Sequence, residues 1–300
     1  MKYQISEILG QSIMTKTPTI IVEGVDDVKI YDSIVSSINT EHFVLPIECV
    51  DGYSEGNEHV IDAMSCIREM PASRYDYRDF IIGIIDKDVR DFRNEIPDNE
   101  LIFPLKVYSI ESHFVNKENI LSILKEITRI TRDLALPELE NLIVDDIFAN
   151  FEDLFILSLD ALKGAVNQDY QSIFSYSYND GRVINQRDIQ LVLARKDELL
   201  EFASSLGIEY SLDSLKLISK GKWLIFLYCY HLERAIKNLP ELCGTQIIHQ
   251  CRICESDIHK CLYKIKDGFT SRTIKSIVMN DVSLSELQYI KSRLHSMTPA

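Results

Sequence analysis

The feature that most constrains the fold is a six-residue apolar run that ends at an acidic residue. The run covers residues 80–85 (Phe-Ile-Ile-Gly-Ile-Ile), and Asp86 follows it directly. A strand with apolar side chains at every position is buried on both faces, as in a parallel sheet covered by helices. The run therefore predicts a central strand of an α/β domain.

The residues around this run alternate between short apolar stretches and helical periodicity. We predict strands at 19–23, 43–50, 80–85 and 105–110, and helices at 28–38 and 60–70. This order is typical of a parallel sheet with helical crossovers. After Asn116 the apolar spacing is helical to the end of the chain. We therefore expect an α/β domain in residues 1–115, followed by a mainly helical domain in residues 116–300.

The composition favours a soluble, cytoplasmic protein. Hydrophobic residues make up 46% of the 300 and charged residues 26%, and no run approaches the roughly 18 apolar residues of a membrane helix. The N-terminus has no apolar signal segment, so the seven cysteines are expected to be reduced thiols. The net charge of −14 counts against a broad, sequence-blind grip on nucleic acid, but not against binding through metal ions.

Three acidic residues follow two of the predicted strands. Glu23 ends the first strand, and Asp86 and Asp88 follow the apolar run at a spacing of two. If the two strands are neighbours they lie about 4.8 Å apart, so the three carboxylates can reach one cation. Ligand sites in open parallel sheets form at these strand ends, and carboxylate oxygens suit Mg²⁺. We predict a magnesium site there.

Three segments resemble motifs of the TOPRIM nucleases of bacterial anti-phage defence, in particular the nuclease subunits of PARIS-type systems. They are residues 20–28, which include Glu23-Gly24, residues 84–88 (Ile-Ile-Asp-Lys-Asp), and residues 108–114 (Tyr-Ser-Ile-Glu-Ser-His-Phe). The resemblance implies a TOPRIM-like sheet in which Glu23, Asp86, Asp88 and Glu111 hold Mg²⁺ or Mn²⁺, with Glu23 also handling a proton. Many TOPRIM proteins have a third acid where this chain has Arg90, so one or two ions remain possible.

The same resemblance implies a function and partners. It suggests a toxic effector that is released from an ABC-type ATPase subunit on infection and then cleaves tRNA. A homodimer is expected by analogy. Two alternatives remain open: a DNA endonuclease that works with an ATPase partner, and a catalytically silent TOPRIM-like binding or regulatory subunit. No P-loop, nucleophile elbow or dinucleotide fingerprint is present in the sequence, so the chain is not expected to be its own ATPase.

Other residues carry weaker hypotheses. Lys222 is a candidate to neutralise charge on the scissile phosphate, or an exposed residue at a helix start. The tyrosine-rich segment 170–182 either stacks unpaired bases or is an ordinary loop with half-buried rings. The segment around Cys251-x-x-Cys254 either supplies soft ligands for zinc or contributes thiols to the core. The remaining candidates of these kinds are a basic rim of Lys29, Lys87, Arg90 and Arg93, and the possible zinc ligands Cys243, His249, His259 and Cys261.

Overall fold

The chain forms two compact units in a computed structural model, which describes residues 2–71, 73–254 and 257–297. Unit 1 comprises Met1–Ser109 and Val282–Ala300, and unit 2 comprises Ile110–Asp281. The predicted division at residue 115 assigned the whole C-terminal part to the second domain. The structure instead returns the last segment of the chain to unit 1. No described helix is long and apolar enough to cross a membrane.

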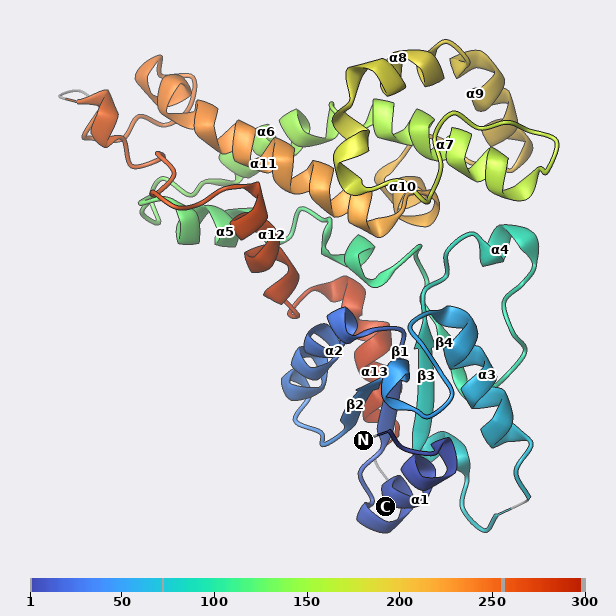
Figure 1. The fold of residues 1–300 in the computed structure, drawn as a ribbon. Helices are drawn as coiled ribbons and strands as arrows, with labels where there is room; N and C mark the ends of the chain where they lie inside the picture. The colour runs from blue at the N-terminus through green and yellow to red at the C-terminus, as the bar shows by residue number, and fades with distance from the viewer. Residues whose placement is uncertain (1, 72, 255–256, 298–300) are drawn as a thin grey trace. The chain divides into compact units, whose positions relative to one another are not determined.

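Unit 1 is an α/β unit with a four-stranded sheet (Figure 1). Its helices and strands are α1 (Ile5–Thr15), β1 (Thr19–Val22), α2 (Val25–Ser37), β2 (Phe43–Pro46), α3 (Asn57–Arg68), β3 (Ile81–Ile85), α4 (Arg90–Arg93), β4 (Ile102–Pro104) and α13 (Gln288–His295). Short 3₁₀ helices are η1 (Ile47–Cys49), η2 (Tyr77–Asp79) and η6 (Ser285–Leu287).

All strands of the sheet are parallel, in the order β2-β1-β3-β4. The prediction of a parallel sheet flanked by helices is confirmed. The first and third strands are neighbours, which was the condition for bringing the acids after them together. The prediction of a fourth strand at 105–110 is wrong. The pairing with β3 ends at residue 104, just before the predicted strand begins. Pro104 pairs with Ile85 as the last residue of β4. The amide of Leu105 still donates to the carbonyl of Ile85 (3.0 Å) before the chain leaves the sheet.

Helices α1 and α3 share one hydrophobic cluster with the sheet. Ile81 and Ile85 of β3 belong to this cluster together with Met64 of α3. A Cβ on Gly83 would lie 2.7 Å from side-chain atoms of Met64 and Val60, so only glycine lets α3 approach β3 this closely. The buried residues of α2 lie outside this cluster, and in Figure 1 α2 covers the opposite side of the sheet. The apolar run is thus buried from both sides, as its composition predicts.

The described residues of unit 2 form helices and contain no strand. They are η3 (Ile110–Phe114), α5 (Ile120–Ile127), α6 (Pro137–Phe148), α7 (Glu152–Val166), η4 (Asp180–Ile184), α8 (Gln186–Leu193), α9 (Lys196–Ser205), α10 (Leu212–Ile218), α11 (Gly221–Gly244), η5 (Ile258–Lys260) and α12 (Ser271–Asn280). The long helix α11 packs against α6, α12 and η3.

The tyrosine-rich segment packs inside unit 2. Phe174 is fully buried, and Tyr176 stacks on the ring of Trp223 with centroids 5.4 Å apart. The hydroxyl of Tyr176 donates to the carbonyl of Ile218 at 2.6 Å, and the indole of Trp223 donates to the carbonyl of Tyr178 at 3.1 Å. These rings are engaged with the protein core. The structural interpretation of the segment therefore holds, and base stacking by these rings is not supported.

Candidate active site at the carboxyl end of the sheet

The candidate site lies where the strand order reverses. From β1 the chain continues to β2 on one side, and it later returns through β3 and β4 on the other. Glu23 follows β1 and Asp86 follows β3, so both leave the same edge of two central, paired strands. Crevices outside this edge, at a reversal of strand order, are where open parallel sheets bind ligands.

Glu23 is held against the end of β3 by a hydrogen bond. Its Oε1 accepts from the backbone amide of Asp86 at 2.7 Å, and its own carbonyl accepts from the amide of Gly56 at 3.1 Å. Burial raises the pKa of the Glu23 carboxyl to about 8; the amide of Asp86 opposes this, while the charges of Asp88 and Asp27 add to it. Without a cation, Glu23 is therefore a carboxyl that readily keeps its proton near neutral pH.

Asp88 is placed by a strained backbone and by Asn57. Its φ of 49° lies in the left-handed region, and its amide donates to the carbonyl of Tyr108 at 2.9 Å. The Asn57 amide group donates to Oδ2 of Asp88 at 2.9 Å and to the carbonyl of Asp86 at 3.4 Å. Left-handed backbone at a non-glycine residue is uncommon and gathers at functional sites. The turn after β3, not strand alternation, positions the second aspartate.

Asn57 is a site residue that the sequence reasoning missed. It is the first residue of α3, is buried, and has an Oδ1 atom that finds no hydrogen-bond partner in the described structure. A buried amide oxygen without a partner is rare and indicates a missing ligand or water. The Gly56-Asn57 pair before a predicted helix is the only sequence signal for it. We call Glu23, Asp86, Asp88 and Asn57 together the acidic edge.

The basic residues near the acidic edge are engaged by other acids. Arg90 pairs with Glu58 at 2.6 Å, and Lys87 pairs with Asp91 at 2.6 Å. The Nε of Arg90 is nevertheless buried without a hydrogen-bond partner in the part of the chain that is described. Of the other predicted rim residues, Lys29 is exposed on α2 and Arg93 lies 3.8 Å from Glu95. Lys87 and Arg90 are therefore already engaged by Asp91 and Glu58.

Two tyrosines lie close to these acids within unit 1. Burial raises the pKa of Tyr31 on α2 well above its usual value, and the charges of Asp86 and Asp27 add to this effect. Burial also raises the pKa of Tyr289 on α13 to about 12, and its hydroxyl accepts from the amide of Lys106 at 3.0 Å. Both hydroxyls therefore stay protonated beside the acids. The C-terminal helix reaches the site region, which the predicted domain division did not anticipate.

The structure gathers three of the predicted metal ligands in one unit. Glu111 and Lys222 belong to unit 2, where Glu111 is half-buried in η3 and Lys222 is exposed in the first turn of α11. Among the described residues, no three acidic side chains place their oxygens all within 4.8 Å of one another. Carboxylates without a cation between them repel, so neighbouring amides hold Glu23 and Asp88 instead.

The donor set of the acidic edge fits a hard divalent ion. Three carboxylates and the unpartnered Oδ1 of Asn57 offer only oxygen, the ligand type that Mg²⁺ and Mn²⁺ prefer. A cation there would also favour the ionised form of Glu23, whose pKa is raised in its absence. A comparison of the chain with protein-family models and with curated proteins found no match.

Proposed function

We propose that this chain is a Mg²⁺-dependent phosphodiesterase, an endonuclease of TOPRIM type whose metal is held by Glu23, Asp86 and Asp88. The observation that supports the proposal is that Glu23 and Asp86 follow the paired strands β1 and β3 at the reversal point of the sheet, and that Asn57 donates a hydrogen bond to Asp88. Divalent ions held by oxygen ligands are typical of phosphodiester hydrolysis. The TOPRIM resemblance of residues 20–28 and 84–88 supports the same class.

A bound Mg²⁺ would polarise the phosphodiester and lower the pKa of an attacking water. The residues of the chain then have distinct tasks. Glu23 either binds the ion as a carboxylate or keeps a proton that can pass to a leaving oxygen. Asn57 orients the carboxylate of Asp88 by its hydrogen bond.

The resemblance supports tRNA as the substrate and an ABC-type ATPase subunit as the partner from which the nuclease is released. It also supports a place in anti-phage defence. Roles for Glu111 as a further ligand and for Lys222 beside the scissile phosphate remain predictions. The net charge of −14 favours a substrate bound through metal ions and a few local cations, because phosphate contacts without metal need clustered Lys and Arg.

The test uses the purified full-length protein with tRNA and plasmid DNA, each with Mg²⁺, with Mn²⁺ and with chelator. We expect metal-dependent cleavage of tRNA, and a loss of about 10³-fold or more in Glu23→Gln and Asp86→Asn, in line with the removal of a preorganised electrostatic group. Asp32→Asn, at an exposed position of α2, is the control of equal charge change and should cleave normally.

Three results would contradict the proposal in different ways. Cleavage that survives the chelator and both variants would exclude the metal mechanism. Cleavage of plasmid but not of tRNA would favour the DNA endonuclease. A folded protein that binds Mg²⁺ and cuts neither nucleic acid would favour a silent binding subunit.

A further inference from the structure

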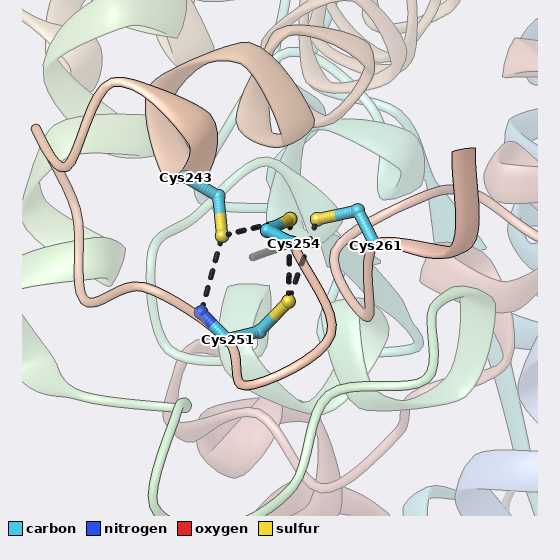
Figure 2. Close-up of side chains that lie close together, drawn as sticks. All are labelled: Cys243, Cys251, Cys254 and Cys261. Atoms are coloured by element: carbon cyan, nitrogen blue, oxygen red, sulfur yellow. Dashed lines mark hydrogen bonds between the residues drawn. The ribbon is translucent and has the colours of Figure 1, made fainter. Parts of the chain in front are cut away.

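Four cysteines of unit 2 converge on one point. Cys243 lies in the last turn of α11, and Cys251, Cys254 and Cys261 come from the segment that follows (Figure 2). The Sγ atom of Cys254 lies 3.4 Å from the Sγ atoms of both Cys243 and Cys251, and Cys251 lies 3.9 Å from Cys261. All four sulfur atoms lie within 4.8 Å of one another. We call this group the cysteine cluster.

The spacing of the sulfurs matches ligands of a single ion. A disulfide requires about 2.05 Å between its sulfurs, and all four cysteines are free. Four sulfurs at a Zn–S distance of about 2.3 Å form a tetrahedron with edges of about 3.8 Å. Iron–sulfur clusters distribute their cysteines over two or more irons and hold them farther apart. Three of the six sulfur pairs lie 3.4–3.9 Å apart and all lie within 4.8 Å, which fits ligands gathered around one tetrahedral ion.

Backbone amides point at the sulfurs, as they do around metal-bound thiolates. The amide of Cys251 donates to Sγ of Cys243 at 3.2 Å. The amides of Ile253 and Cys254, two and three residues beyond Cys251, donate to the Cys251 sulfur. The amide two residues beyond Cys261, that of Tyr263, donates to the sulfur of Cys261. Such donors favour the thiolate, which is the form that binds a metal.

Several thiolates this close together need a cation. Thiolates whose sulfur atoms lie 3.4–3.9 Å apart repel one another as long as no positive charge lies among them. A divalent ion would remove that repulsion.

An ordinary apolar core does not account for this arrangement. Between α11 and α12, the described residues form only the short 3₁₀ helix η5. Regular backbone hydrogen bonding therefore contributes little to holding this segment in place. Its contacts are isolated bonds, such as Tyr263 to the carbonyl of His249 (2.8 Å) and the amide of Arg129 to the carbonyl of Leu262 (2.9 Å). A cross-link that joins four positions over 19 residues would give such a segment its fold.

We propose that Cys243, Cys251, Cys254 and Cys261 bind one structural zinc ion. All four coordination positions are taken by the protein, so the site is closed to substrate. Neither His249 nor His259, which the sequence left open as ligands, belongs to the group of described residues that converges there. This site is independent of the proposed nuclease chemistry in unit 1, because its donors are sulfur and the acidic edge offers oxygen.

The test is the metal content of the full chain, purified under reducing conditions without chelator. We expect about one zinc per chain, and loss of that zinc in Cys251→Ser and in Cys254→Ser. Cys66→Ser is the matched control, because Cys66 is an exposed thiol of α3 outside the cluster, and it should keep the metal. Replacement of zinc by Co²⁺ should give the intense visible bands of a tetrahedral thiolate site.

The wild-type protein decides the question even if the serine variants fail to fold. A reduced, folded wild-type chain that carries no zinc and develops no Co²⁺ bands would overturn the proposal. Iron in place of zinc would overturn it as well. Because zinc content is measured without any substrate, failure here leaves the nuclease proposal standing, and failure of cleavage leaves the zinc site standing.

Discussion

The acidic edge of unit 1 and the cysteine cluster of unit 2 are built in opposite ways. At the acidic edge, oxygen donors come from the ends of two strands, a strained turn and the first residue of a helix, and hydrogen bonds hold them apart. In the cysteine cluster, all four sulfurs lie within 4.8 Å of one another. The second arrangement brings its donors to one point and the first does not.

This difference separates two uses of a metal ion. A catalytic site keeps a coordination position open and holds its ion with hard ligands that exchange readily, whereas a structural site is closed by the protein. The local backbone agrees with this distinction. The acidic edge sits on a regular sheet that is formed by apolar burial, while the segment with three of the cysteines has little regular structure. We therefore expect only the second to depend on its ion to fold.

The largest expected effect is the selective loss of structure in unit 2 when zinc is removed. A zinc-selective chelator in excess Mg²⁺ should abolish hydrogen-exchange protection in residues 243–266, because zinc binding in small Cys sites is worth about 10 kcal/mol. Omission of Mg²⁺ alone should leave the protection of residues 243–266 unchanged. Peptide-resolved hydrogen exchange measures both. If residues 243–266 keep their protection in a sample verified to be zinc-free, the cysteine cluster does not need zinc to fold. The proposed difference between the two sites would then be wrong.

The next effect concerns Asn57, which links Asp88 to the end of β3. Asn57→Ala removes both hydrogen bonds, so the Mg²⁺ concentration needed for half-maximal cleavage should rise about ten- to a hundredfold, as for other residues that orient metal ligands. Asn150→Ala, an exposed asparagine of unit 2, is the control. Titration of Mg²⁺ in the cleavage assay measures the change. An unchanged Mg²⁺ requirement would mean that Asn57 only supports the fold.

The sequence predicts the parts of the structure that depend on apolar patterning. The run at 80–85 identifies a strand buried on both faces, and the acids after it mark the correct edge of the sheet. The fourth strand was misplaced because β4 has only three residues and ends at a proline, whereas the run at 105–110 is longer and has Leu, Val, Tyr and Ile among its six residues. Local pattern does not show which of two adjacent runs finds a partner strand.

Two further features depend on contacts between residues far apart in the chain. Asn57 belongs to the site because it donates a hydrogen bond to Asp88, which lies 31 residues further along the chain. No sequence periodicity relates the two positions. The return of α13 to unit 1 depends on contacts such as the bond between Tyr289 and Lys106. For the cysteines, the spacing favoured thiols of the core over a zinc site. Only the loss of helix after Gly244 brings the four sulfurs together.

The smallest expected effect concerns Glu23 and sharpens the acidic side of the comparison. The folded-state pKa of Glu23, about 8, lies above its usual 4.5. The folded protein therefore binds this proton more tightly than the unfolded chain does, so the contribution of Glu23 to stability is complete below pH 4.5 and is lost as the pH rises to 8. Glu23→Gln, which keeps the oxygen that accepts from Asp86, should match the wild type near pH 4.5.

At pH 8.5 without divalent ions, the same variant should be more stable than the wild type by about 1–2 kcal/mol, a fraction of what the full pKa difference allows. Urea unfolding followed in unit 1 at both pH values measures this. Mg²⁺ at pH 8.5 should cancel the advantage of the variant, because the ion stabilises the carboxylate that only the wild type has. A stability difference between Glu23→Gln and the wild type that is the same at both pH values and does not change with Mg²⁺ would contradict this. It would mean that ionisation of Glu23 does not destabilise the fold and that Glu23 does not bind the ion. The acidic edge would then be a polar rim of the sheet instead of the open counterpart of the cysteine cluster.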